Sequence, residues 1–402
     1  MHLEVGELVE LEITKVVHGG AGLGHHHGLA VFVPGVLPGE RVVARVRQLK
    51  KSFGFADLLD VRDPNPSRVP HIWPEADYSR PPEERAGGAD FGHAALAYQR
   101  ELKKAVLVEA MARQGGIDIS ELPSPVVAPI DDSADGLRWR TRVTLHVGPN
   151  GRAGPYAERS RRVIPVESLP LATDGLESLA AHREAWTDRD HVSLVDPSAE
   201  QPRVIGKPFA DITERVFGEE FLLSETSFWQ VHHNAASFLS NEVERALQAL
   251  DIDPTHLHFD FYSGVGLLAR ALLRRFGREA RLIAVESDSE ASQFLAHNLR
   301  NFPHSRAVFD DVERFLGEYQ QNVPVGVVVL DPPRAGAKET VLRPLAGLRP
   351  AAIVYVACDP VALGRDTAFL QQCGYRLGEI RAFDFFPHTH HFESMAVFTS
   401  EP

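Results

Sequence analysis

The stretch Asp260-Phe261-Tyr262-Ser263-Gly264-Val265-Gly266 follows an apolar run that begins near residue 256. A short apolar run that ends at glycines is typical of a buried strand and a tight turn into a helix. The glycines let the backbone approach a ligand, and Glu286, at the end of the next apolar run, can accept hydrogen bonds from both hydroxyls of a ribose. The stretch therefore predicts an α/β sheet that binds a nucleotide-containing cofactor at its first turn.

Further strand-like runs follow this turn, and helical patterns separate them. We expect strands over residues 281–286, 306–310, 325–331 and 351–357, with 392–398 closing the set. Alternation of strands and helices predicts a doubly wound, Rossmann-like α/β domain over residues 221–402.

Two cofactors fit the glycine turn. Gly264-x-Gly266-x-x-Ala269 with an acid about twenty residues later also matches a dinucleotide fingerprint, so a nicotinamide-dependent oxidoreductase is one interpretation. Asp260 favours S-adenosyl-L-methionine, because a carboxylate is unfavourable near pyrophosphate and favourable near a cation. The turn Asp331-Pro332-Pro333-Arg334 places another carboxylate at the end of a strand. Enzymes that methylate exocyclic amines commonly have an aromatic residue after Pro-Pro, so Arg334 disfavours that reaction.

Cys358 lies in Tyr355-Val356-Ala357-Cys358-Asp359-Pro360, directly after an apolar run. Asp359 suits a helix N-cap and Pro360 the first turn of that helix. Backbone N–H groups at a helix N-terminus favour a thiolate, whereas the Asp359 charge opposes it. A free cysteine is most often a small, inert core residue, and Glu393 alone would be a surface carboxylate. Neither residue by itself indicates catalysis, and only their joint occurrence in the motifs described below favours it.

Composition bounds the class of protein. The chain has 402 residues, 44% hydrophobic and 24% charged, with only two cysteines, Cys358 and Cys373. These values predict a globular protein of two or three domains in a reducing, cytoplasmic compartment. The start of the chain lacks signal-peptide features and no apolar run reaches membrane-spanning length, so we expect no membrane association. The net charge of −13 argues against nucleic acid, but basic clusters at 41–51 and 159–162 leave RNA contact open.

The chain divides into three predicted regions. Residues 1–62 show short alternating runs between glycines and predict a small, OB-like β-barrel. Residues 63–220 predict an irregular linker, a helix that ends at Gly115-Gly116, and a central, mostly β domain. The triplet His25-His26-His27 is expected in an exposed turn rather than in a metal site.

Four motifs now converge on one family. They are Val33-Pro34-Gly35-Val36-Leu37-Pro38-Gly39-Glu40, Ser227-Phe228-Trp229-Gln230, Cys358-Asp359-Pro360 and Phe386-Pro387-x-Thr389-x-His391-x-Glu393. With them, nearly the whole chain resembles the RNA uracil-5-methyltransferase family, which includes tRNA and 23S rRNA enzymes. The resemblance implies that residues 1–62 form an RNA-binding TRAM domain and that 221–402 form a class I methyltransferase domain.

The resemblance also implies the chemistry. Cys358 would add to uracil C6 and Glu393 would remove the C5 proton. Gln230 and Asp331 would line the uracil and cofactor pocket, and Tyr262 and Glu286 would hold the adenosine of S-adenosyl-L-methionine at Gly264 and Gly266. Asp311 would meet the adenine amine or cap a helix. RNA, as rRNA or tRNA, is the expected partner, and the protein is expected to be a monomer.

The chain departs from the family pattern at two places. Many members hold an iron–sulfur cluster through a Cys-Gly-Gly-Cys run, where this chain has Ala86-Gly87-Gly88-Ala89. Because such clusters need thiolates, we expect none, and no metal site. Asp359 replaces the usual Asn. An RNA-binding protein with a vestigial methyltransferase fold is the alternative that does not require catalysis.

Overall fold

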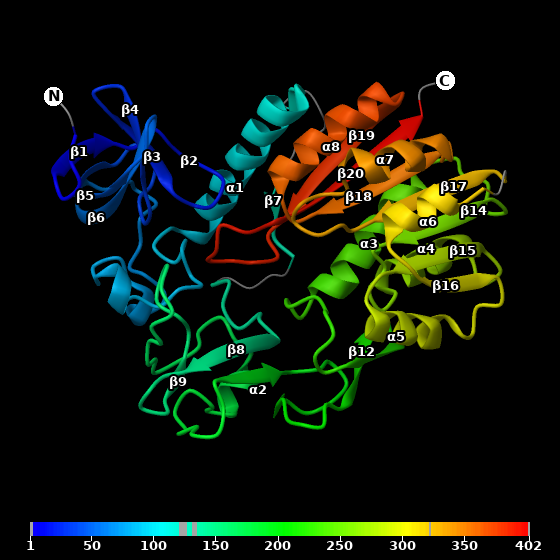
Figure 1. Cartoon of the computed structure of the whole chain (residues 1–402), viewed down its shortest axis with the longest axis horizontal. Helices are drawn as coiled ribbons and strands as arrows, with labels where there is room; N and C mark the ends of the chain where they lie inside the picture. The colour runs from blue at the N-terminus through cyan, green and yellow to red at the C-terminus, as the bar shows by residue number, and fades with distance from the viewer. Residues whose placement is uncertain (1–2, 120–126, 131–134, 321–322, 401–402) are drawn as a thin grey trace. The chain divides into compact units, whose positions relative to one another are not determined.

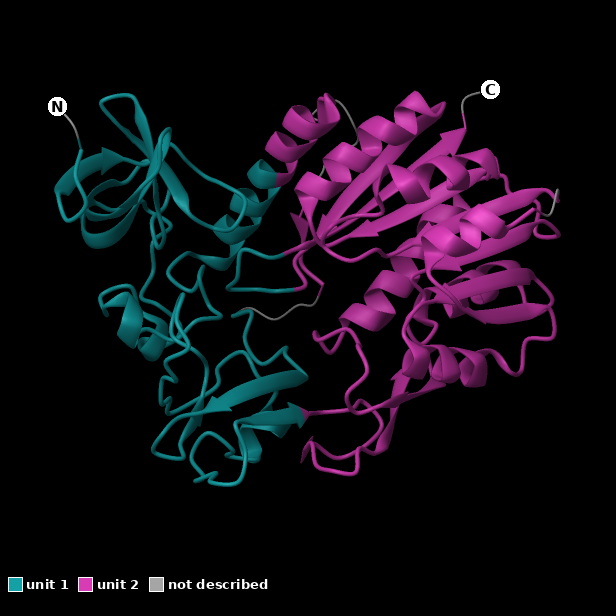
Figure 2. Ribbon diagram, viewed as in Figure 1, with its two compact units in different colours: residues 1–106, 133–194, 386–391 teal, residues 107–132, 195–385, 392–402 magenta. Residues whose placement is uncertain are grey.

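The computed structural model describes residues 3–119, 127–130, 135–320 and 323–400. The chain forms two compact units (Figure 2). Unit 1 comprises residues 1–106, 133–194 and 386–391, and unit 2 comprises 107–132, 195–385 and 392–402. None of the helices in the described part of the chain is both long and apolar enough to cross a membrane.

Unit 1 begins with a rolled, six-stranded sheet of order β1-β5-β6-β4-β3-β2 (Figure 1). Its strands are β1 (Leu8–Glu12), β2 (Lys15–Val16), β3 (Gly22–His26), β4 (Leu29–Val33), β5 (Arg41–Leu49) and β6 (Phe53–Asp63). Inward side chains such as Val9, Val33 and Ala44 are buried and alternate with exposed residues, as a half-buried strand requires. The expected barrel is confirmed, although His25 and His26 lie within β3 and only His27 is in the turn.

The rest of unit 1 is mostly irregular. Its described elements are η1 (Pro74–Ala76), η2 (Pro82–Glu84), β8 (Arg142–Val147), β9 (Ala153–Gly154), α2 (Asp174–Ser178) and β10 (His191–Val195). Helix α1 (Leu96–Ala110) begins here and continues as η3 (Met111–Gly115). Gly116 ends that helix with φ 64°, so the predicted stop at Gly115-Gly116 is confirmed.

Unit 2 is built on an eight-stranded sheet of order β16-β15-β14-β17-β18-β20-β19-β7. The strands are β7 (Val127–Ala128), β14 (Leu257–Phe261), β15 (Arg281–Glu286), β16 (Ser305–Phe309), β17 (Val325–Leu330), β18 (Ala352–Ala357), β19 (Tyr375–Phe383) and β20 (Glu393–Ser400). The helices are α3 (Ala235–Gln248), α4 (Leu267–Phe276), α5 (Ser289–Leu299), α6 (Val312–Glu318), α7 (Lys338–Gly347) and α8 (Pro360–Gln372). Short strands β11 (Arg203–Val204), β12 (Asp211–Val216) and β13 (Glu219–Ser224) precede the sheet.

Strands β14 to β18 are parallel, whereas β20 is antiparallel to β18 and to β19. The predicted α/β fold is confirmed, and β20 is the last strand along the chain, as expected for residues 392–398. Two strands of the sheet were not predicted: β19, which pairs with β20, and β7, which pairs with β19. The carboxyl ends of the parallel strands thus share one edge with the first residue of β20, Glu393. We call this the carboxyl edge.

Candidate active site

The glycine turn after β14 is held by the acid at the end of β15. Gly264 N donates a hydrogen bond of 2.7 Å to Glu286 Oε2, and Asp288 N donates one of 2.7 Å to Oε1. Gly264 has φ 54° and Gly266 φ 99°, a region that favours glycine. A Cβ on Gly266 would lie 2.9 Å from Leu295 Cδ1, so a larger residue would also have to displace the end of this leucine side chain.

A pocket of about 420 Å³ opens beside this turn, and only residues of unit 2 line it. Four of the predicted cofactor residues line the pocket: Gln230, Tyr262, Gly264 and Asp331. Asp260, Ser263 and exposed Phe228 line it as well. The sequence analysis did not predict that Phe228 lines the pocket, although this residue lies inside the Ser227–Gln230 motif.

The remaining predicted cofactor residues lie outside the lining of this pocket. Glu286 does not line the pocket, but it accepts a hydrogen bond from Gly264, which does. Gly266 is the N-cap residue of α4. Asp311 is the N-cap of α6: its Oδ1 accepts from Glu313 N at 2.9 Å and from Arg314 N at 3.2 Å. The helix-cap interpretation of Asp311 is therefore confirmed, while its role toward adenine stays a prediction.

The Asp260 carboxyl is fully buried in β14, and neither of its oxygens has a hydrogen bond of good geometry from a described residue. Its pKa is raised to about 8, chiefly by burial and to a smaller extent by the charges of Asp331 and Glu286, while interactions with Ser263 and the Ala269 backbone oppose the rise. A buried acid whose charge is not fully compensated by hydrogen bonds is stabilised by a cation. The residues present therefore fit a cofactor that carries positive charge, such as S-adenosyl-L-methionine.

Strand pairing places Cys358 and Glu393 together. In the antiparallel register of β18 and β20, Ala357 lies opposite Ser394, so the next pair along is Cys358 and Glu393. The Glu393 side chain is buried, and its Oε1 has no described hydrogen-bond partner. Sequence predicted both residues, and only the pairing of β20 with β18 brings together two positions 35 apart.

The thiol of Cys358 is in an acidic environment. Burial raises its pKa to about 12, and the charges of Glu393 and Asp331 act in the same direction, whereas Arg334 lowers it. Burial, followed by the charge of Asp331, also holds the Glu393 pKa well above its usual range. Burial and the carboxylates thus oppose the effect of the helix N-terminus, which favours the thiolate. The predicted cap is confirmed: Asp359 Oδ1 accepts from Val361 N and Ala362 N, both at 2.9 Å.

A buried hydrogen-bond network holds the loop that carries Asp331 and Arg334. Asp366 Oδ2 accepts from Tyr355 Oη at 2.7 Å and from Ala337 N at 2.9 Å. Asp366 lies on α8 and Tyr355 on β18, so the loop is fixed to the elements on either side of Cys358. Sequence reasoning missed this network, because an acid in a helical pattern gives no sign that it is buried.

Unit 1 contains the segment that matches the cysteine run of the family. Ala86 and Ala89 are buried and carry no ligand atoms, so the residues present do not fit an iron–sulfur cluster. Polar pairs lie on both sides of the segment: Arg85 with Glu158, and Asp90 with His390, whose Nδ1 lies 2.6 Å from Asp90 Oδ2. Among the described residues, no group of three His, Cys, Asp or Glu side chains is arranged to hold a metal ion.

Comparison with known proteins identifies the family. The sequence profile of the TRAM domain matches residues 2–59, and that of tRNA (uracil-5-)-methyltransferase matches residues 188–401, more than half of the chain. The chain belongs to the tRNA (uracil-5-)-methyltransferase family. As a member, it is an S-adenosyl-L-methionine-dependent RNA methyltransferase that acts on uracil C5.

Individual relatives agree with this assignment. A protein of Streptomyces coelicolor named as an uncharacterized RNA methyltransferase is 33% identical over 98% of this chain and 93% of its own length. The 23S rRNA (uracil(1939)-C(5))-methyltransferase RlmD of Shewanella denitrificans is 28% identical over 97% of this chain and 95% of its own. The structure of Pyrococcus abyssi tRNA (uracil-54, C5)-methyltransferase with S-adenosyl-L-homocysteine has the same fold, with a TM-score of 0.71, 21% identity, and coverage of 97% and 100%.

Proposed function

We propose that this methyltransferase forms 5-methyluridine in rRNA or tRNA with Cys358 as nucleophile and Glu393 as general base. The observation that carries the proposal is the register of β18 with β20, which makes these residues neighbours at the carboxyl edge. A thiol beside a buried carboxyl suits a reaction that needs covalent addition and later removal of a proton.

Cys358 acts first. Uracil C5 is a weak nucleophile, so the Cys358 thiolate adds to C6, and the electron pair of the C5–C6 bond moves into an enolate over C5 and C4. When bound, S-adenosyl-L-methionine would supply an electrophilic methyl group; the bond from C5 to this methyl would form as the methyl–sulfonium bond breaks, and the thioether product would leave. Arg334 is the cation near the thiol that favours the thiolate, against the two carboxyls.

Glu393 acts second. C5 now carries both a methyl group and a proton, and the Glu393 carboxylate takes that proton. The electron pair re-forms the C5–C6 double bond and expels the Cys358 thiolate, which frees the RNA. The raised pKa of Glu393 makes its carboxylate a stronger base than that of an exposed glutamate.

The cofactor residues follow from the pocket beside Gly264. Asp260 and Asp331 would compensate a positive charge there, while Glu286 would exchange its bond from Gly264 N for contacts to ribose hydroxyls. Tyr262 would pack on the adenosine, Asp311 would face the adenine amine, and Gln230 would face uracil. A base inside a duplex cannot reach Cys358, so the target uridine lies in a loop or is flipped out.

Two finer points belong to the same proposal. The rRNA-acting relative and the tRNA name of the family support either RNA as the target. We further propose a monomer that acts in the cytoplasm, where reducing conditions keep the Cys358 thiol free.

Incubation with tritiated-methyl S-adenosyl-L-methionine and unmodified total RNA tests this function, followed by nucleoside analysis and separation of RNA by size. Label in 5-methyluridine that is lost with Cys358→Ala supports the proposal, and the labelled size class identifies tRNA or rRNA. Label in another nucleoside contradicts the Cys358 mechanism. RNA binding without any label favours the binding-only alternative.

A further inference from the structure

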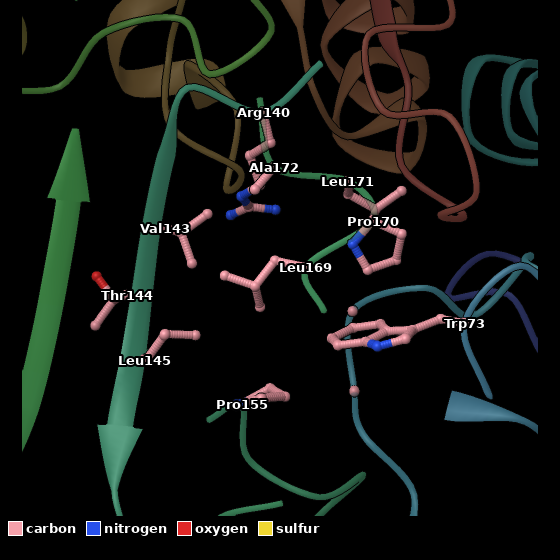
Figure 3. A pocket seen from close by; sticks show the side chains of 12 residues that line it. Trp73, Arg140, Val143, Thr144, Leu145, Pro155, Leu169, Pro170, Leu171 and Ala172 are labelled. Carbon is pink, nitrogen blue, oxygen red and sulfur yellow. The ribbon is translucent and has the colours of Figure 1, made fainter. Parts of the chain in front are cut away.

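Unit 1 has a second pocket, of about 610 Å³, that the methyl-transfer chemistry does not use (Figure 3). Its walls are mainly apolar, as is common for sites that hold small organic groups. Val143 and Leu145 of β8 lie on one side, Leu169 and Leu171 lie on another, and Trp73 projects from a separate loop. The pocket thus combines three segments that are far apart in the sequence.

Trp73 gives the pocket an aromatic surface. It precedes η1, is only 5% exposed, and extends its ring into the space between Pro170 and Pro155 (Figure 3). The β8 side chains face it across the pocket. A flat ring can pack between an indole and an aliphatic wall, which is how proteins commonly hold unstacked bases.

Arg140 brings a charge into this apolar space. Its guanidinium lies among Val143, Leu169 and Ala172 (Figure 3). Nε donates to Arg142 O at 2.9 Å, and no acidic side chain in the described part of the chain pairs with it. Burial lowers the Arg140 pKa because the charge is partly removed from water. A desolvated cation without an acidic partner is costly, and a ligand that offers acceptor atoms would offset that cost.

The chemistry of guanidinium narrows the choice of ligand. Arginine offers only donors, so it matches an edge with two acceptors and no competing donor. Guanine presents such an edge with O6 and N7, whereas adenine places an amino group beside N7. A phosphate would also suit Arg140, but it gains nothing from Trp73 and the aliphatic walls.

We propose that this pocket holds an unpaired guanine of the RNA substrate, packed between Trp73 and β8, with O6 and N7 accepting hydrogen bonds from Arg140. The proposal rests on the proposed function for RNA as the substrate, and it deepens that function by naming a second nucleotide that the enzyme reads. The base is distinct from the methylated uridine. Recognition of two unpaired bases restricts the target to RNA with a particular loop, which a single uridine cannot do.

Photo-crosslinking tests the location. An RNA that the wild-type enzyme methylates is transcribed with 6-thioguanosine, bound to the full chain, irradiated, and its crosslinked peptides are identified by mass spectrometry. We expect a crosslink at Trp73 or within residues 140–145. Guanine crosslinks that all map outside the residues lining the pocket overturn the proposal.

Matched arginine variants test the readout. Arg140→Gln should weaken binding of a guanine-containing oligonucleotide about fivefold or more and leave a guanine-free one of equal length nearly unchanged. Arg161→Gln removes the same charge from an exposed position of unit 1 and should affect both oligonucleotides equally. Equal effects of Arg140→Gln on both oligonucleotides overturn the proposal.

Two further points need a control: whether the charge or the planar guanidinium is responsible for the guanine preference, and whether Arg140→Gln still folds. Arg140→Lys keeps the charge without the planar fork, so it should still lose guanine preference. If Arg140→Gln unfolds, as judged by its thermal transition, the wild-type crosslink alone decides. Methylation is measured in the same samples: failure to methylate any RNA removes the proposed function, whereas methylation with crosslinks outside the pocket removes only the guanine site.

Discussion

At the carboxyl edge of unit 2, Asp331 and Glu393 lie near the Cys358 thiol and Asp260 lies near Asp331, whereas the pocket of unit 1 is lined by one guanidinium and no acid. The edge gathers acidic side chains and suits a cation, which would favour their ionised forms. The pocket has an excess of positive charge and suits an acceptor. In both, burial makes the unbalanced charge unfavourable until a ligand of opposite character arrives.

The difference teaches that buried charge without a partner indicates the character of the missing ligand, and that two such sites can divide the work of one enzyme. In our proposal, the edge carries the chemistry and the cofactor. The pocket, if our inference holds, carries part of the RNA selection. The two functions should therefore be separable by single substitutions.

Cys358→Ala should produce the largest effect. Without the thiol, uracil C5 is not activated, and methyl transfer should fall by at least about 10³-fold. RNA affinity, measured by filter binding, should stay within about twofold of the wild type, since recognition lies elsewhere. Methylation within tenfold of the wild type would remove Cys358 from its role, and a large loss of RNA affinity would break the separation between edge and pocket.

Glu393→Gln should block only the second half of the reaction. Addition of Cys358 and methylation can still occur, but removal of the C5 proton should slow by about 10²- to 10⁴-fold. A covalent enzyme–RNA adduct should then accumulate and appear as a slow band on a denaturing gel. Glu393→Gln combined with Cys358→Ala is the control and should give no adduct; an adduct in that double variant would mean that another residue is the nucleophile.

Asp260→Asn should weaken the binding of S-adenosyl-L-methionine about tenfold at pH 9. The free Asp260 carboxyl has a pKa of about 8, so it becomes charged as pH rises through 8, and affinity for a cation should rise over the same interval. The asparagine variant should lack this rise, as measured by equilibrium dialysis from pH 7 to pH 9.

Asp253→Asn is the matched control for Asp260→Asn. Asp253 is an exposed acid of unit 2 that bonds to Thr255, so its loss changes the net charge equally without affecting the cofactor pocket. Its affinity should follow the wild-type pH curve. If the affinity of Asp260→Asn for S-adenosyl-L-methionine still rises with pH, ionisation of the Asp260 carboxyl is not the cause of the rise.

Asp359→Asn should have the smallest effect, a rise of about two- to threefold in the rate at which iodoacetamide alkylates Cys358 at pH 8. Asparagine can keep the cap, while loss of one negative charge lowers the thiol pKa and raises the thiolate fraction. Peptide mass spectrometry separates Cys358 from Cys373. Alkylation that is unchanged or slower would mean that the Asp359 charge does not raise the pKa of the Cys358 thiol.

Much of unit 2 was predictable from sequence because its central strands are continuous apolar runs that end at distinctive turns. Strands β14, β15, β17 and β18 lie within about one residue of their predicted bounds. Strand β19 was missed because a register irregularity near Gly378 interrupts its alternation of buried and exposed residues. Its place beside β20 depends on long-range pairing that no local pattern shows.

By itself, the sequence determined the local features of the site: the glycine turn and the capped helix after Cys358 follow from residue types at short spacing, and the motif that contains Glu393 is recognised by its resemblance to the family. Only the tertiary structure decided which side chains meet and what burial does to them. It sets Cys358 opposite Glu393, raises the pKa of the thiol and of Asp260, and brings Trp73 to Arg140. The physical reason is that hydrogen-bonding turns and caps are local interactions, whereas desolvation depends on every segment that packs around a charge.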